Sequence, residues 1–122
     1  MSDGFEAEKK TASAWFRTLR DEIVAAFEGL EDSQAGDAPA GRFEVSETTR
    51  TSDDGSDAGG GVMSVMRGGR VFEKVGVNIS TVFGQLGDAA QKAMAARGVP
   101  GMAEDPRFWA SGISLVAHMQ NP

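Results

Sequence analysis

The feature that most constrains this 122-residue chain is the run VFEKVGVNISTVF, residues 71–83, in which apolar and polar residues alternate. Successive side chains of a β-strand point to opposite faces, so such a run gives a strand with one apolar and one polar face. The apolar face, interrupted by Glu73, comprises Val71, Val75, Val77, Ile79, Thr81 and Phe83, and the polar face comprises Lys74, Gly76, Asn78 and Ser80. One face therefore packs on a core, and the other meets water, a ligand or a partner.

A second apolar run, VMSVM, precedes this strand at residues 62–66. The four residues between the runs include Gly68-Gly69, and a Gly-Gly pair between β-rich runs is a hairpin signal. We therefore predict a β-hairpin over residues 62–83. Gly76 is the position at which a bulge would exchange the two faces.

One helix is predicted before the hairpin in the sequence, and a second helix after it. Apolar residues between Ala12 and Leu30 recur at three- and four-residue steps, which predicts a helix over residues 6–30 that docks on the core. An Ala-rich segment over residues 88–97 predicts a shorter helix, with Asp88 as its N-cap and a glycine after its end.

Two further strands and one loop complete the predicted mixed α+β fold. We expect strands over residues 42–51 and 112–118, and a Gly/Asp-rich loop over residues 52–61. That loop lacks the acid register of a calcium loop and the lysine of a phosphate loop. The last strand is apolar on both sides, which is typical of a central position in a sheet.

Composition excludes several classes of function. Without cysteine, disulfide scaffolds, thiolate metal sites and cysteine nucleophiles are impossible, and one histidine cannot supply two imidazoles to a metal. A net charge of −6 disfavours binding to nucleic acid or anionic membrane. The chain shows no bilayer-spanning stretch and no secretory signal. We expect a single cytoplasmic domain without a membrane span.

Ser114 and His118 lie in the last predicted strand and carry polar chemistry there. On a strand they share one face but stand ~13 Å apart, too far for a Ser–His nucleophile pair. Two interpretations remain open. Either they mark two polar points along one wall of a flat ligand site, or Ser114 satisfies a backbone group while His118 faces solvent.

The strings VFEKVGVNIS (71–80), GGGVMSVMRGGR (59–70) and FWASGISLVAHMQNP (108–122) resemble the N-terminal part of oxygen-dependent coproporphyrinogen-III oxidase. The resemblance covers essentially the whole chain, and it implies an α+β fold with an antiparallel β-sheet flanked by helices. Met119 stands where family members often have proline, and this departure touches none of the residues carried over below.

The resemblance implies a cytoplasmic homodimer of haem biosynthesis that converts coproporphyrinogen III to protoporphyrinogen IX. Molecular oxygen is the co-substrate, two propionates become vinyl groups, and no organic cofactor takes part. Ser114 matches a substrate-contacting serine, and His118 matches a histidine assigned to a divalent metal in some members. The residues matching a dimerisation segment are Val71, Phe72, Glu73, Lys74, Val75, Gly76, Val77, Asn78, Ile79 and Ser80.

Family members are more than twice this long, and their proton-donor histidine and an Asn-x-Arg substrate motif would lie beyond Pro122. We therefore expect an N-terminal fragment without turnover of its own. Arg50, Arg67 and Arg70 are candidates, by charge alone, for anchoring propionates. The alternative is that each is a solvated loop residue. The alternative functions are a non-catalytic tetrapyrrole-binding module and a dimerisation module.

Overall fold

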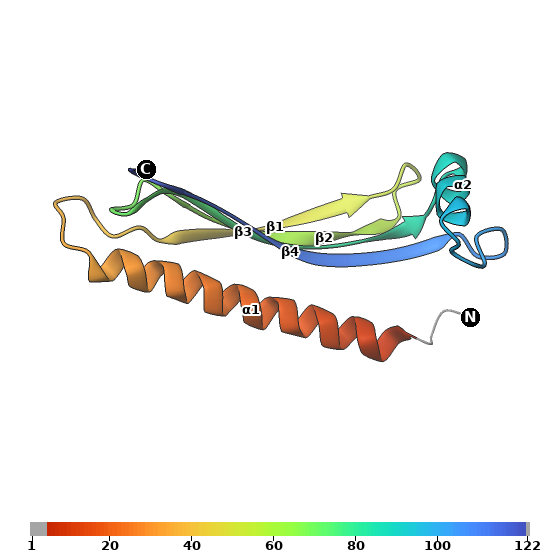
Figure 1. The fold of residues 1–122 in the computed structure, drawn as a ribbon, viewed down its shortest axis with the longest axis horizontal. Coiled ribbons are helices and arrows are strands. Elements are labelled where there is room, and N and C mark those ends of the chain that lie inside the picture. Colours follow the sequence, from red (N-terminus) through yellow and green to blue (C-terminus); the bar gives the residue numbers. More distant parts are fainter. Residues whose placement is uncertain (1–4, 122) are drawn as a thin grey trace.

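The computed structural model describes residues 5–121 and shows two helices and a four-stranded antiparallel sheet. The elements are α1 (Glu6–Ser33), β1 (Phe43–Thr51), β2 (Asp57–Arg67), β3 (Phe72–Gln85), α2 (Asp88–Ala96) and β4 (Arg107–Met119). Strands consecutive in sequence are neighbours in the sheet, in the order β1-β2-β3-β4. Helix α1 runs along one face of the sheet, and α2 lies at the end of the sheet away from the α1–β1 connection (Figure 1). The predicted α+β class is confirmed.

The core lies between α1 and the β2–β3 hairpin. Met66, Val75 and Val77 are fully buried there. Phe27 of α1 packs edge-on against Phe72, with ring centroids 4.9 Å apart and an interplanar angle of 70°, an arrangement that aromatic pairs favour. The apolar face predicted for residues 71–83 is therefore the face that carries the core.

The opposite face of the sheet, which we call the open face, carries the polar side chains of β3. Because Val75 and Val77 point to α1, the alternation directs Lys74, Gly76 and Asn78 the other way. The bulge lies between Phe72 and Lys74 rather than at Gly76. The alternation is therefore unbroken from Lys74 onward.

Strand β2 begins at Asp57, so the predicted Gly/Asp-rich loop is shorter than expected. Its glycines belong to the strand because neighbouring backbone approaches them closely. A Cβ on Gly60 would lie 2.4 Å from the carbonyl oxygen of Thr48, and one on Gly61 would lie 2.3 Å from that of Ile79. A triple glycine is typical of a loop, but here it permits close packing of three strands.

Strand β4 spans Arg107–Met119 and lies at one edge of the sheet that the structure describes. It pairs with β3 almost throughout its length. Its apolar side chains remain largely uncovered, with Val116 58% exposed. The central position predicted for this segment stays a prediction about a longer sheet.

The C-terminal end of α1 is fixed by one fully buried carboxylate, that of Glu31. Its two oxygens accept hydrogen bonds from the backbone N–H groups of Gly41, Arg70, Val71 and Phe72 at 2.5–3.0 Å. Burial by itself raises the pKa of this carboxyl group, but the four hydrogen bonds outweigh it and lower the pKa to about 2.

Candidate functional site

Ser114 and His118 both lie on β4 and face the open side of the sheet. In the register of the sheet Ser114 is paired with Asn78, and His118 is paired with Lys74. Because β4 is a regular strand here, the two residues stand four positions and ~13 Å apart. They therefore cannot form a Ser–His pair. Both side chains are exposed, so a wall of a ligand site remains a prediction beside the alternative that His118 faces solvent.

The open face around Asn78 and Ser114 combines two glycines with two exposed apolar side chains. Asn78 is paired with Met63 of β2, which is 42% exposed, and Gly76 is paired with Val116 of β4, which is 58% exposed. A Cβ added to Gly112 would meet no atom within 4 Å, and one added to Gly76 would meet only the Asn78 amide nitrogen, at 3.8 Å. No side chain therefore rises from these positions. The result is a low strip beside the Asn78 amide and the Ser114 hydroxyl, bordered by the apolar side chains of Met63 and Val116. We call this strip the floor; its polar and apolar groups suit the face of a broad ligand.

Cationic side chains stand at the end of this floor nearer His118. Arg67 of β2 is paired with Lys74 of β3, so the two form one row with His118 on the open face. Both are exposed, and neither takes part in an ion pair within residues 5–121. Arg50 does not belong to this row, because it lies on β1 opposite Gly59. A row of this kind offers carboxylate-binding groups beside the polar floor.

Arg70, the third predicted anion anchor, is committed elsewhere. Its guanidinium donates hydrogen bonds to the carbonyl oxygens of Ala38 and Gln34 at 2.5 and 2.9 Å. It thereby fastens the loop after α1 to the hairpin turn. Lys74 was not among the predicted anchors, although its place on the polar face of the alternating run was available as a signal.

The described residues do not fit a metal centre around His118. Residues 5–121 contain no group of three or more His, Asp or Glu side chains that is arranged to hold a metal ion. The cross-strand neighbour of His118 is Lys74, whose positive charge opposes a cation. We derive no chemical step through a metal.

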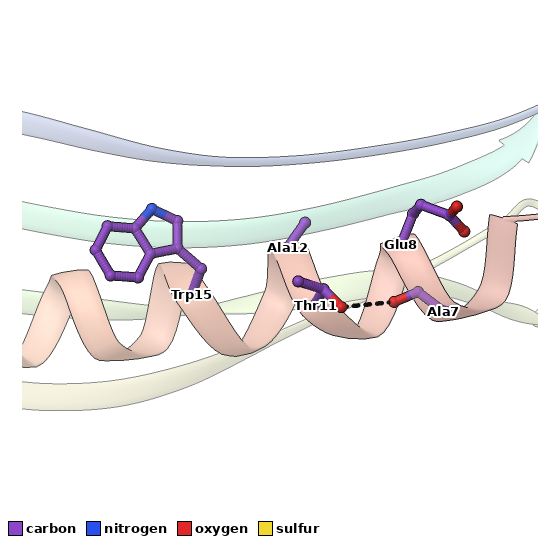
Figure 2. Close-up of a pocket in the computed structure, with 5 residues that line it drawn as sticks. All are labelled: Ala7, Glu8, Thr11, Ala12 and Trp15. Carbon is purple, nitrogen blue, oxygen red and sulfur yellow. Dashed lines mark hydrogen bonds between the residues drawn. The ribbon is translucent and has the colours of Figure 1, made fainter.

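Two hollows lie outside the open face. The larger, of about 460 Å³, follows one stretch of α1, where Thr11 Oγ1 donates to the carbonyl oxygen of Ala7 at 2.9 Å (Figure 2). Its lining includes Glu8 but no basic side chain, so it does not suit an anionic ligand. It is lined by Ala7, Glu8, Thr11, Ala12 and Trp15.

The smaller hollow, of about 300 Å³, lies between α1 and the covered face of the sheet. Arg17 of α1 and Glu47 of β1 bring opposite charges to it, and Ser111 of β4 lies at its wall. The Ser111 hydroxyl is already hydrogen-bonded to Thr81 Oγ1 and to the carbonyl oxygen of Ser80, both at 3.1 Å. Neither hollow contains Ser114 or His118.

The segment predicted to mediate dimerisation forms most of β3, which is paired with β2 on one side and β4 on the other. Val75 and Val77 are buried beneath α1. A partner subunit would therefore reach this segment through its open-face side chains or its Val71 end. The dimer itself stays a prediction.

Over residues 5–121, neither helix combines the length and the apolar character required to cross a bilayer. This agrees with the absence of a long apolar run in the sequence.

Comparison with known proteins gives one consistent result. The family model described as coproporphyrinogen III oxidase matches residues 11–122. The chain is 46% identical over 114 residues to the oxygen-dependent coproporphyrinogen-III oxidase of Rickettsia bellii (strain RML369-C), and 44% identical to that of Rickettsia felis. Each alignment covers 93% of this chain and 38% of the relative. The chain thus spans well under half the length of these curated relatives.

Proposed function

This chain belongs to the coproporphyrinogen III oxidase family, and from that premise we propose that it forms the N-terminal part of an oxygen-dependent oxidase acting on coproporphyrinogen III. The proposed reaction converts the substrate to protoporphyrinogen IX in haem biosynthesis. Two propionate side chains become vinyl groups, carbon dioxide leaves, and molecular oxygen accepts the electrons to form hydrogen peroxide.

One observation carries the proposal: Ser114 and His118, which match family positions, lie on one sheet face with the glycine-lined floor and with cations at its end. Ser114 stands beside Asn78 on glycine-lined backbone, and Lys74 and Arg67 stand in the row of His118. Coproporphyrinogen is a broad macrocycle that carries four carboxylates. The floor suits the macrocycle, and the cationic row suits its carboxylates.

Each residue of the floor has a limited task in this proposal. Ser114 donates or accepts a hydrogen bond at the macrocycle, and Lys74 and Arg67 hold a propionate by charge. Each propionate that becomes a vinyl group gives up two electrons and two protons with its carbon dioxide, and oxygen takes them up as hydrogen peroxide. Because the substrate itself supplies these electrons, the protein mainly positions the substrate and moves protons. The proton donor and the Asn-x-Arg motif of the family belong to sequence outside this chain, so we expect the 122-residue chain alone to lack turnover.

We further propose a cytoplasmic homodimer, with the β3 segment near its interface. A divalent metal at His118 would need ligands from outside the described residues, since this region supplies one imidazole beside Lys74. Metal binding by His118 is therefore the least supported of the roles taken from the resemblance.

The full gene product tests this function. We expect it to consume oxygen and release carbon dioxide with coproporphyrinogen III, as followed with an oxygen electrode and product analysis. Ser114→Ala removes one substrate hydrogen bond and should lower kcat/KM about tenfold. Thr18→Ala also removes a hydroxyl, but from the exposed side of α1 and away from the open face, and should alter kcat/KM less than about twofold.

Absence of oxygen-dependent conversion by the wild-type gene product would refute the enzymatic proposal. Porphyrinogen binding without oxygen uptake would instead favour a tetrapyrrole-binding module. A stable dimer indifferent to porphyrinogen would favour a dimerisation module. Equal effects of Ser114→Ala and Thr18→Ala on kcat/KM would remove Ser114 from the substrate site.

A further inference from the structure

Within residues 5–121, two buried side-chain polar atoms have no hydrogen-bond partner: Ser64 Oγ and Asn78 Oδ1. Buried polar groups are nearly always paired, so each exception calls for an explanation. The two atoms lie on opposite faces of the sheet. Ser64 is fully buried on the α1 side, where no ligand can reach it, whereas Asn78 belongs to the open face.

The position of Asn78 makes it accessible to a ligand even though its amide oxygen is turned inward. It is only partly buried, it is paired with Ser114, and Gly76 precedes it by two positions. No hydrogen bond holds its amide within the described part of the chain. Rotation about the Cβ–Cγ bond therefore breaks no interaction and turns the oxygen toward the open side.

The chemistry of the proposed substrate supplies the missing donor. A porphyrinogen has four pyrrole N–H groups, and its saturated bridges let the pyrrole rings tilt so that these hydrogens leave the mean plane. In the oxidised porphyrin the ring is flat and the remaining N–H hydrogens point to the ring centre. An acceptor beneath the macrocycle face can therefore bond to the reduced form and not to the oxidised form.

We propose that Asn78 determines specificity for the reduced macrocycle, because its amide oxygen accepts a hydrogen bond from a pyrrole N–H group above the Gly76–Gly112 floor. This inference rests on the proposed function and assigns a role that goes beyond the residues matched to the family. It also explains why the amide is left unpaired in the absence of substrate, since a partner within the protein would compete with the ligand.

The test measures binding of two ligands to the full gene product without oxygen, so that no turnover occurs. The ligands are coproporphyrinogen III and coproporphyrin III, and the variant is Asn78→Leu. We expect its dissociation constant for the porphyrinogen to rise about tenfold, the effect of one lost hydrogen bond. The constant for the porphyrin should change less than about twofold. The melting temperature should stay equal or rise, since an unpaired buried oxygen is removed.

Ser64→Ala is the matched control because it removes the other unpaired oxygen from the covered face. It should leave both dissociation constants unchanged. Asn78→Val, with a side chain favoured in strands, replaces Asn78→Leu if that variant does not fold.

The outcomes separate this inference from the function on which it rests. Normal turnover and binding by the wild type, with unchanged porphyrinogen affinity in the Asn78 variants, would overturn the role of Asn78 alone. An equal rise in the dissociation constants of both ligands would also overturn it, because Asn78 would then shape the floor without distinguishing the reduced form from the oxidised form. A wild-type protein that binds neither ligand would overturn both proposals.

Discussion

At the scale of single residues, Glu31 joins three segments that are distant in sequence. It lies in the last turn of α1. Its carboxylate accepts hydrogen bonds from backbone N–H groups at Gly41, in the following loop, and at residues 70–72, in the turn before β3. A Cβ on Gly69 would lie 2.6 Å from both carboxylate oxygens. Glycine at position 69 therefore makes room for the charge that orders the turn.

Glu31→Gln should reduce the free energy of unfolding by about 3 kcal/mol at pH 7. In the folded protein the pKa of this carboxyl group is about 2, below its ordinary value of 4.5. The contribution is therefore fully present above pH 4.5 and is lost as the pH falls from 4.5 to 2. Urea denaturation of wild type and variant at pH 7 and pH 3 measures both the loss and its pH dependence.

The control for this prediction is Asp32→Asn. Asp32 is exposed and contacts Arg42 at 2.7 Å on the surface, so its loss should cost less than about 1 kcal/mol. A difference between wild type and Glu31→Gln that is the same at pH 7 and pH 3 would show that the charge of Glu31 does not stabilise the fold.

Sequence patterns could place Ser114 and Asn78 on polar strand faces, because alternation is a local property. They could not identify Glu31, whose partners are backbone groups 10 to 41 positions away and carry no sequence signature. They also could not separate Arg70 from the other candidate anion anchors. Its role depends on two carbonyl oxygens in a distant loop.

At the scale of elements, the hairpin is the part of the fold that the sequence predicts best. Alternation over residues 71–83 and the Gly68-Gly69 turn are each local signals, and the β2–β3 pairing agrees with both. The start of β2 was not predictable in this way. Gly59–Gly61 have no side chains to alternate, and only the nearness of neighbouring strands shows why glycine is required there.

Gly60→Ala should destabilise the sheet by about 2 kcal/mol, because the new methyl group would meet the Thr48 carbonyl oxygen at 2.4 Å and push the strands apart. Gly112→Ala is the matched control in another strand, since nothing lies within 4 Å of its added Cβ. It should change the free energy of unfolding by less than about 0.5 kcal/mol. Chemical denaturation of both variants compares them, and equal stabilities would contradict the close approach of β1 and β2.

At the scale of the whole molecule, the sheet is covered by α1 on one face only (Figure 1). The open face and the β4 edge combine exposed backbone with exposed apolar side chains. Leu115, Val116 and Met119 are 48%, 58% and 58% exposed. An uncovered apolar edge strand is a template for pairing with another chain.

The 122-residue chain by itself should therefore self-associate as its concentration rises, whereas the full gene product should keep one defined oligomeric state. Val116→Lys places a charge on the exposed β4 edge and should shift the short chain toward monomer, because edge lysines oppose strand pairing. Thr18→Lys adds the same charge to the exposed side of α1 and should leave association unchanged. Sedimentation velocity over a concentration series measures the association of the short chain, the full gene product and the two lysine variants.

If the short chain stays monomeric at every concentration, β4 does not act as a pairing edge, and its apolar side chains need no cover from a longer protein. If both lysine variants shift the short chain toward monomer equally, net charge rather than the β4 edge controls its association.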